Sequence, residues 1–173
     1  VLDMAQRRRI EPIYTYGPLI HNPQTVELLR KRGIIPISGL DEISSCEAGA
    51  AIVIRAHGIS PQERKTIKEK GLKIIDATCP KVGYVQGIIK KYTALGYTVT
   101  SSGDREHPEV AGLWGYTEGR GLIVSSPEDA EKLPAMDPVC LVAQTTQDTD
   151  DYRRIVEKIQ EKRSLEGDIL ETV

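Results

Sequence analysis

Residues 51–80 decide the fold, and their sequence is AIVIRAHGISPQERKTIKEKGLKIIDATCP. Two apolar runs in this stretch, 51–56 and 72–77, have the β-rich composition of strands. Between them, Ser60 pairs an N-cap side chain with a following proline, and Gly71 stands where a helix needs a left-handed C-cap. A strand, a helix and a second strand in this order predict parallel βα units and argue against a meander.

The same alternation continues on both sides of this stretch. The remaining strands are predicted at 13–16, 34–37, 97–101, 121–125 and 139–144. Helix starts are marked again by a capping residue before proline at Asn22 and Ser126, and Gly33 and Gly96 follow helical runs. We therefore expect an α/β fold of two similar three-layer units with mainly parallel sheets.

The rhythm of strands and helices divides the chain into regions. We expect a first α/β unit over 1–80 and a second over 81–164. Residues 165–173 end in an apolar run that is just beginning, so they are expected to start a third unit or to form a linker.

Composition excludes several classes of function. The chain has 23 Lys and Arg against 25 Asp and Glu, no Phe and one Trp, so neither a basic surface nor an aromatic platform for nucleic acid is expected. The apolar stretches are far shorter than the roughly 20 residues of a membrane span, and no segment resembles a signal peptide. Three cysteines without a CxxC pair fit a reducing compartment, so we expect a cytoplasmic protein.

The three histidines, His21, His57 and His107, all lie where a strand-like run gives way to a helix start, and Cys79 lies at a fourth such junction. In a parallel α/β sheet these junctions gather along one edge, where ligands bind. Helix N-termini present free N–H groups there, and imidazoles add further donors. The sequence therefore predicts an anion such as a phosphate as the ligand.

Each of these histidines has a plainer explanation beside the functional one. His21 could simply help to cap the helix that follows it. Gly58 after His57 would allow a ligand or a backbone to approach closely. His107 and Glu109 flank a proline at a helix start, where they could hold an anion and transfer a proton. Alternatively, Glu109 stands there only to interact with the helix dipole.

The cysteines and threonines divide in the same way. Cys79 ends its strand before a proline, as a ligand or nucleophile at a sheet edge would, whereas Cys140 resembles a small core residue and Cys46 an incidental surface thiol. Thr145 and Thr146 follow a strand and could donate to a phosphate oxygen, or could only cap the next helix.

The motifs PLIHNPQ, RAHG, DATCP, HPEV and QTT occur in this order between about residues 13 and 146. Each is short, but the ordered set is specific and closely resembles the LytB (IspH) family. This family comprises the 4-hydroxy-3-methylbut-2-enyl diphosphate reductases of the non-mevalonate isoprenoid pathway. The resemblance implies three similar α/β units in a trefoil-like arrangement around a central cavity, with the first unit here lacking its first strand.

The resemblance also implies a cofactor and a reaction. The family holds a 4Fe-4S cluster through three cysteines, and Cys79 matches the middle one. One iron is left open for the substrate hydroxyl. Two-electron reduction removes this hydroxyl as water and yields isopentenyl and dimethylallyl diphosphates. The implied partners are the small diphosphate substrate and an electron donor of the ferredoxin or flavodoxin class.

Roles for the remaining site residues follow from the same resemblance. The family's diphosphate-binding histidines match His21, His57 and His107. Its glutamate for proton delivery matches Glu109, and a threonine of the cavity matches Thr145.

The chain also departs from the family pattern. The segments with the first and third cluster cysteines are not present, and KVGYVQ follows DATCP where a hydroxyl residue is expected. We therefore interpret the chain as a portion of a LytB-type reductase that alone holds no complete cluster and is inactive. Two alternatives remain: a divalent-metal hydrolase or isomerase that uses the three histidines and Glu109, and a non-catalytic phosphate-binding module.

Overall fold

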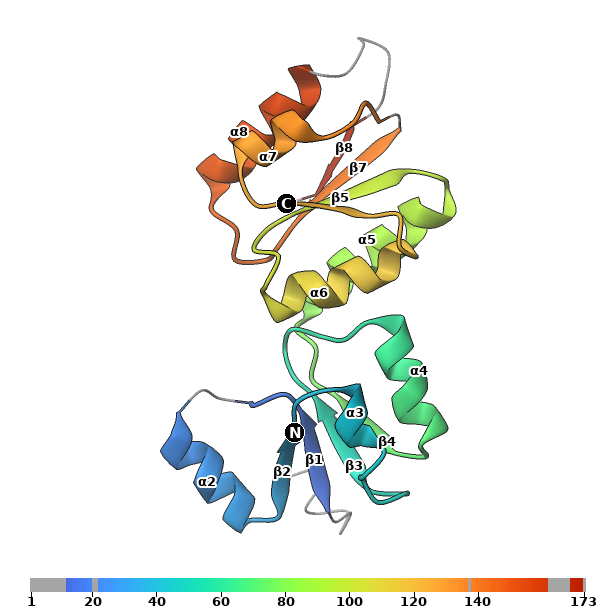
Figure 1. The fold of residues 1–173 in the computed structure, drawn as a ribbon, viewed down its shortest axis with the longest axis vertical. Coiled ribbons are helices and arrows are strands. Elements are labelled where there is room, and N and C mark those ends of the chain that lie inside the picture. The colour runs from blue at the N-terminus through green and yellow to red at the C-terminus, as the bar shows by residue number, and fades with distance from the viewer. Residues whose placement is uncertain (1–11, 20–21, 137, 162–168, 173) are drawn as a thin grey trace. The chain divides into compact units, whose positions relative to one another are not determined.

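The computed structural model describes residues 12–19, 22–136, 138–161 and 169–172 (Figure 1). The chain forms two compact units that divide between Cys79 and Pro80, next to the boundary expected from the sequence. Each unit has its own sheet and its own core.

The first unit contains a four-stranded parallel sheet in the order β2-β1-β3-β4. Its strands are β1 (Ile13–Tyr16), β2 (Ile34–Ile37), β3 (Ala51–Ile54) and β4 (Lys73–Asp76). Its helices are α2 (Pro23–Lys31), α3 (Leu40–Ile43) and α4 (Pro61–Glu69).

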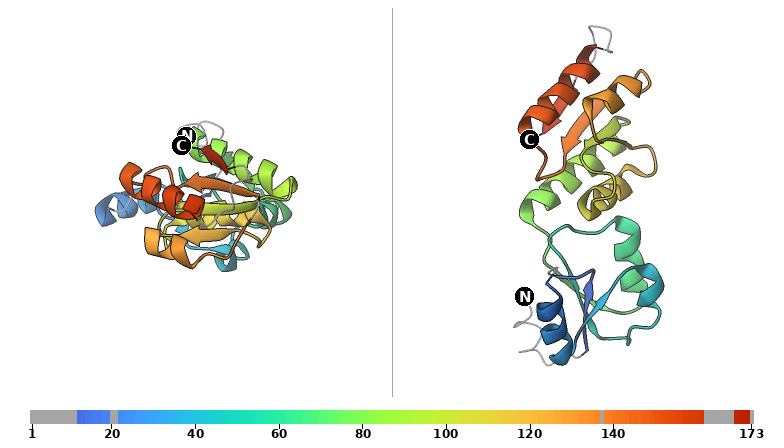
Figure 2. Two further views of the ribbon diagram at one scale, coloured as in Figure 1. Left: turned by 90° about the horizontal axis from the view of Figure 1, so that it is seen from above. Right: turned by 60° about the vertical axis from the view of Figure 1, so that its left-hand side comes forward.

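Side-chain alternation along the strands builds two cores, one on each face of this sheet. Ile13 and Val53 belong to the core that also takes in Leu29 of α2. Ile52 faces the other way and belongs to a core with Ile67 of α4. The helices accordingly lie on opposite sides of the sheet, with α2 on one and α3 and α4 on the other (Figure 2). Each fully buried aliphatic side chain stabilises the unit by about 1.5–3 kcal/mol.

The second unit repeats this plan with the strand order β6-β5-β7-β8, again all parallel. Its strands are β5 (Thr98–Ser102), β6 (Leu122–Val124), β7 (Val139–Ala143) and β8 (Ile169–Thr172). Its helices are α5 (Pro80–Ala94), α6 (Pro108–Trp114), α7 (Pro127–Lys132) and α8 (Thr149–Glu161), with a 3-10 turn at Gly115–Thr117. Helices α5 and α6 cover one face, and α7 and α8 cover the other (Figure 1).

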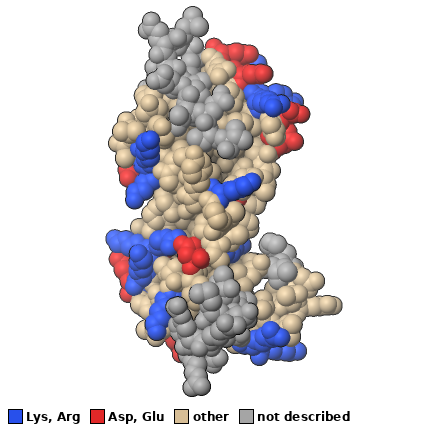
Figure 3. Space-filling model, turned by 180° about the vertical axis from the view of Figure 1, so that it is seen from behind, with Lys and Arg blue, Asp and Glu red and all other residues tan. Residues whose placement is uncertain are grey.

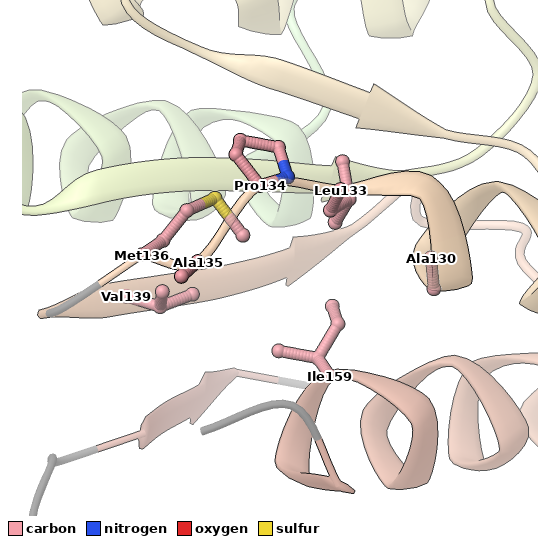
Figure 4. A pocket seen from close by; sticks show the side chains of 7 residues that line it. All are labelled: Ala130, Leu133, Pro134, Ala135, Met136, Val139 and Ile159. Carbon is pink, nitrogen blue, oxygen red and sulfur yellow. The ribbon is translucent and has the colours of Figure 1, made fainter. Parts of the chain in front are cut away.

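The apolar line of α8 forms the centre of one core of this unit. Ile155 and Ile159 pack with Leu141 of β7, which confirms the interpretation of α8 as a scaffold helix. A gap of about 10 Å³ remains between this helix, α7 and the start of β7, lined by apolar side chains (Figure 4). It has room for about one water molecule at most, so it is a packing defect and not a ligand site.

The predicted helix ends are confirmed by their caps. Asn22 and Ser126 each accept a hydrogen bond from the backbone N–H three residues later. Ser60 forms a complete capping box with Glu63. Gly33, Gly71 and Gly96 all adopt left-handed backbone conformations after their helices.

Two features differ from the sequence-based expectations. Ile169–Thr172 pairs with β7, so these residues belong to the second sheet, where a linker or the start of a third unit was expected. Cys46 was expected to be a surface thiol, but it is buried at 3% exposure in the core of the first unit. The short helix α3, which the sequence did not predict, turns its chain inward so that the thiol donates to the Glu42 carbonyl at 3.6 Å.

The strand order positions the candidate site. In each sheet the chain runs first to one side of the starting strand and then crosses to the other side. The connections therefore diverge at the carboxyl ends of β1 and β3 in the first unit and of β5 and β7 in the second. Such switch points open a crevice in which doubly wound proteins bind ligands.

The surface carries both signs of charge. On the face shown in Figure 3, lysine and arginine side chains of the described residues are interspersed with aspartate and glutamate. Among the helices that the structure describes, none has the length and apolar composition needed to cross a membrane.

Candidate functional site

In the second unit, the loops after β5 and β7 meet around Glu109. This glutamate is in the first turn of α6, yet it is only 2% exposed. Its carboxylate accepts two hydrogen bonds from Thr145, one from the backbone N–H to Oε1 at 2.7 Å and one from Oγ1 to Oε2 at 3.0 Å. Glu109 is therefore a buried, oriented acid, and an exposed carboxylate that only interacts with the helix dipole would not have these partners.

His107 is the N-cap of the same helix. Its Nδ1 accepts a hydrogen bond from the Glu109 backbone N–H at 3.2 Å. This bond assigns the tautomer, because a neutral imidazole that accepts at Nδ1 carries its proton on Nε2. The ring therefore presents an N–H donor, which is suited to an anionic ligand.

The structure also decides between the two explanations for the threonines. The cap of α8 is Asp148, whose Oδ1 accepts from the N–H groups of Asp150 and Asp151. Thr145 is bonded to Glu109, and Thr146 accepts from Gln144 at 3.0 Å. Neither threonine caps the helix, so the capping interpretation of these residues is wrong.

Gln144 is a residue of this cluster that sequence reasoning missed. It is 8% exposed and follows β7 directly, and its side-chain Oε1 accepts from the Asp104 backbone N–H at 3.1 Å. The QTT motif contained the residue, but the sequence gave no indication that the amide turns inward toward the other loop.

A pocket of about 540 Å³ opens beside Thr145 within the second unit. It lies between the first turns of α5 and α8 at the end of β7, and its walls include Lys81, Tyr84, Gln144, Thr145 and Tyr152. Glu109 is not among its lining residues, so the hydroxyl of Thr145 lies between the buried carboxylate and the pocket.

In the first unit, the structure brings His57 and Cys79 onto neighbouring loops. Residues 55–58 form a turn in which the Gly58 N–H donates to the Arg55 carbonyl at 3.0 Å, and Gly58 has φ +70°. The Cys79 N–H donates to the carbonyl of Ala56 at 2.9 Å, immediately before His57. The close approach predicted for Gly58 is thus part of a backbone turn.

The segment leading to Cys79 is held by Asp76. This carboxylate accepts from the Thr78 N–H at 3.0 Å and hydroxyl at 2.5 Å, and from Arg64 of α4 at 2.6 Å. Partial burial raises the pKa of Asp76, but the hydrogen bonds from Thr78 and the charge of Arg64 outweigh this effect and lower it overall. The aspartate of DATCP therefore fixes the backbone beside the thiol.

A second carboxylate ties the end of β1 to the start of α4. Glu63 accepts from the Tyr16 hydroxyl at 2.7 Å through Oε1 and from the Ser60 N–H at 2.6 Å through Oε2. Burial, reinforced by the hydrogen bond to Glu63, raises the pKa of Tyr16, so the phenol stays neutral. Burial also lowers the pKa of Arg55, which stands at the start of the His57 turn.

The three cysteines are not equivalent. Burial raises the pKa of Cys140 to about 11 and also raises that of Cys46, and both thiols are buried in the cores. Cys79 is partly exposed at the carboxyl edge of the first sheet, as a metal-binding thiol must be. The described residues contain no group of three or more His, Cys, Asp or Glu that could hold a metal. They therefore offer an iron–sulfur cluster a single suitable ligand, Cys79.

The structure thus gathers the predicted site residues into two groups. His107, Glu109 and Thr145 form one group in the second unit, and His57 and Cys79 form the other in the first. His21 lies outside the described residues.

Fold and site together define the class: a doubly wound α/β protein with polar side chains at the switch points of both sheets. The family model of the LytB protein matches residues 1–172, and the chain belongs to the LytB family.

Relatives and solved structures agree with this assignment. A 4-hydroxy-3-methylbut-2-enyl diphosphate reductase of Opitutus terrae is 40% identical over 167 residues, which cover 92% of this chain and 57% of the relative. The enzyme of the same name from Citrifermentans bemidjiense is 41% identical over 143 residues, or 83% of this chain and 50% of the relative.

A solved structure of (E)-4-hydroxy-3-methyl-but-2-enyl diphosphate reductase, the terminal enzyme of the non-mevalonate pathway, superposes with a TM-score of 0.82. It is 34% identical, and the match covers 98% of this chain and 59% of the other. The Plasmodium falciparum E-1-hydroxy-2-methyl-but-2-enyl-4-diphosphate reductase also gives a TM-score of 0.82, at 32% identity over 93% of this chain and 50% of the other. The chain therefore spans little more than half the length of these proteins, and the fold predicted from the sequence is confirmed.

Proposed function

We propose that this chain is the part of a 4-hydroxy-3-methylbut-2-enyl diphosphate reductase that supplies the proton donor, diphosphate-binding histidines and one cluster ligand. The observation that carries the proposal is the pair formed by Glu109 and Thr145, a buried acid whose only printed side-chain partner opens onto a pocket. The names of the relatives and of the solved structures support the same reaction.

In this proposal, Glu109 holds the proton that the leaving hydroxyl needs. The carbon–oxygen bond of the substrate breaks, two electrons enter the allyl fragment, and two protons are consumed: one leaves with the hydroxyl as water and one joins carbon. Because Glu109 is buried and Thr145 lines the pocket, the proton passes from the carboxyl group through the Thr145 hydroxyl, 3.0 Å away. Proton transfer by such a positioned acid typically contributes about 10²–10⁴-fold to the rate.

The imidazoles bind the diphosphate end of the substrate. His107 presents its Nε2 proton because Nδ1 is occupied by the backbone of Glu109. His57 stands on the tight turn at the end of β3, and His21 precedes α2 on the corresponding loop after β1. Donors from imidazoles and helix starts offset the charge of a diphosphate.

Cys79 is the proposed cluster ligand in this chain. When bound, the 4Fe-4S cluster supplies electrons and a Lewis-acidic iron for the substrate oxygen. An electron-donor protein of the ferredoxin or flavodoxin class would reduce it. The three free cysteines support a reducing compartment, and we place the enzyme in the cytoplasm.

Metal analysis of the full-length protein, purified anaerobically, tests the ligand. Cys79→Ser should lose most of the iron, acid-labile sulfide and visible colour. Cys46→Ser is the matched control, because Cys46 is buried in the core and its hydrogen bond to Glu42 can be kept by a hydroxyl. Equal cluster content in both variants would reject Cys79 as a ligand.

Turnover with the diphosphate substrate tests the acid. Glu109→Gln keeps the shape of the side chain and can still accept from the Thr145 N–H, but it has no carboxylic proton to give. We expect a fall in kcat of about 10²-fold or more with cluster content and diphosphate affinity little changed. Full activity of this variant would exclude the proposed role.

A further inference from the structure

The loop between β5 and α6 is fastened to the loop after β7 at two points. One is the pair of hydrogen bonds from Thr145 to Glu109, near the helix start. The other lies at the beginning of the loop, where the Gln144 side chain accepts from the Asp104 N–H at 3.1 Å. Adjacent residues of one loop thus hold both ends of the segment that carries His107.

Every hydrogen-bonding group of Gln144 is engaged in this structure. Its N–H donates to the Ser102 carbonyl at 2.8 Å, and its carbonyl accepts from the Gln147 N–H at 2.9 Å. In the side chain, Oε1 accepts from Asp104 while Nε2 donates to the Thr146 hydroxyl at 3.0 Å. The amide needs both a donor and an acceptor here, which fixes its orientation.

The space around this amide is equally restricted. A Cβ atom at Gly103 would lie 2.8 Å from Cβ and 2.9 Å from Oε1 of Gln144. Only a glycine lets the loop settle this closely on the side chain. The following residue, Asp104, accepts the His107 N–H through its carbonyl at 3.0 Å, so the position of Asp104 is transmitted to the N-cap of α6.

We propose that Gln144 is a positioning residue that sets the β5–α6 loop, and with it His107 and Glu109, relative to Thr145. The inference rests on the proposed function insofar as these residues handle the substrate. Removing the amide leaves the Asp104 N–H without its buried acceptor and frees the loop to shift. Displacements of about 1 Å at a reacting group can cost about 10²-fold in rate, so we expect a large effect on kcat.

The chain offers a matched pair of variants for the test. Gln144→Met keeps the volume and removes both polar atoms. Gln86→Met makes the same change at another buried glutamine of the unit, in α5, whose Nε2 makes no hydrogen bond in the described part of the structure. Both variants are made in the full-length, cluster-containing protein.

Two measurements are needed, one of them independent of activity. In Gln144→Met, amide hydrogen exchange at Asp104 should become about fivefold faster or more, because a hydrogen bond worth about 1 kcal/mol is lost. The kcat should fall at least about tenfold, with a smaller change in KM and unchanged iron content. Gln86→Met should match the parent protein in all three.

Unchanged exchange at Asp104, or faster exchange with kcat within about twofold of the parent, would overturn the proposal. Should Gln144→Met fail to fold, Thr146→Val replaces it, since it removes only the partner of Nε2 at an exposed residue. This variant should also speed exchange at Asp104 and lower kcat, and no change in either would refute the role. A parent protein without reductase activity would instead reject the proposed function, and the exchange measurement would still decide whether Gln144 holds the loop.

Discussion

The guanidinium of Arg55 packs directly against the backbone of Gly17. A methyl group at residue 17 would lie 2.6 Å from Cζ of Arg55, and Gly17 has φ +77°. Gly17 follows β1 and opens the loop toward His21, and Arg55 begins the turn that carries His57. One contact therefore joins the starts of two histidine-bearing loops.

Gly17→Ala is expected to destabilise the first unit more than Gly33→Ala. Both positions are left-handed, at φ +77° and +73°, so both variants pay a similar conformational cost of about 1–2 kcal/mol. Gly33 has open space around it, whereas Gly17 also meets Arg55. Hydrogen exchange of the amides in β1 and β3 measures the unfolding free energy. Equal losses would mean that the arginine swings aside freely, and in an Arg55→Ala background the excess should vanish.

Asp76→Asn is expected to lower stability in a pH-dependent way. The folded-state pKa of Asp76 lies below its ordinary value, so its charge stabilises the fold above about pH 4 and the benefit is lost as pH falls through the folded-state pKa. The carboxylate is 40% exposed, so we expect a loss of no more than about 1 kcal/mol at neutral pH. Urea unfolding at neutral and strongly acidic pH should show a difference only at the higher pH.

The three thiols are expected to react in a fixed order. Cys79 is partly exposed, while Cys46 and Cys140 are buried with raised pKa values, that of Cys140 being about 11. Iodoacetamide at mildly alkaline pH should therefore label Cys79 of the cluster-free protein first, as peptide mass spectrometry can follow. Early labelling of Cys140 would contradict the burial of β7.

Thr145→Val is expected to slow turnover by about tenfold or more, because the carboxyl group of Glu109 loses its hydroxyl contact with the pocket. The backbone hydrogen bond from residue 145 to Glu109 stays in place, so binding of the diphosphate should change little. Thr145→Ser retains the hydroxyl and serves as the control. Steady-state kinetics that give both variants the same kcat would remove the hydroxyl from the proton path.

Much of the fold could be predicted because its determinants are local. Apolar runs, capping residues before proline and glycines at helix ends act within a few residues, and the structure has these strands and caps where they were predicted. The short helix α3 and the burial of Cys46 were missed, because both depend on packing against β1. Strand β8 was missed because its partner, β7, is distant in the sequence.

The candidate site was predictable only in part, for the same physical reason. The positions of His57, Cys79, His107 and Thr145 at strand and helix junctions were visible in the sequence. The bonds that orient them were not, since the contact of Thr145 with Glu109 spans 36 residues and that of Gln144 with Asp104 spans 40. The side chain of Gln144 has no local pattern that distinguishes an inward amide from an exposed one.

The strand orders β2-β1-β3-β4 and β6-β5-β7-β8 are the same arrangement made twice from different residues. Duplication of one ancestral gene segment would leave such a pair, with the backbone plan retained and the loops free to diverge. The first copy then acquired a thiol after its last strand, at Cys79, and the second an acid after its first, at Glu109. Specialisation of the two copies thus assigned electron and proton chemistry to separate halves of the chain.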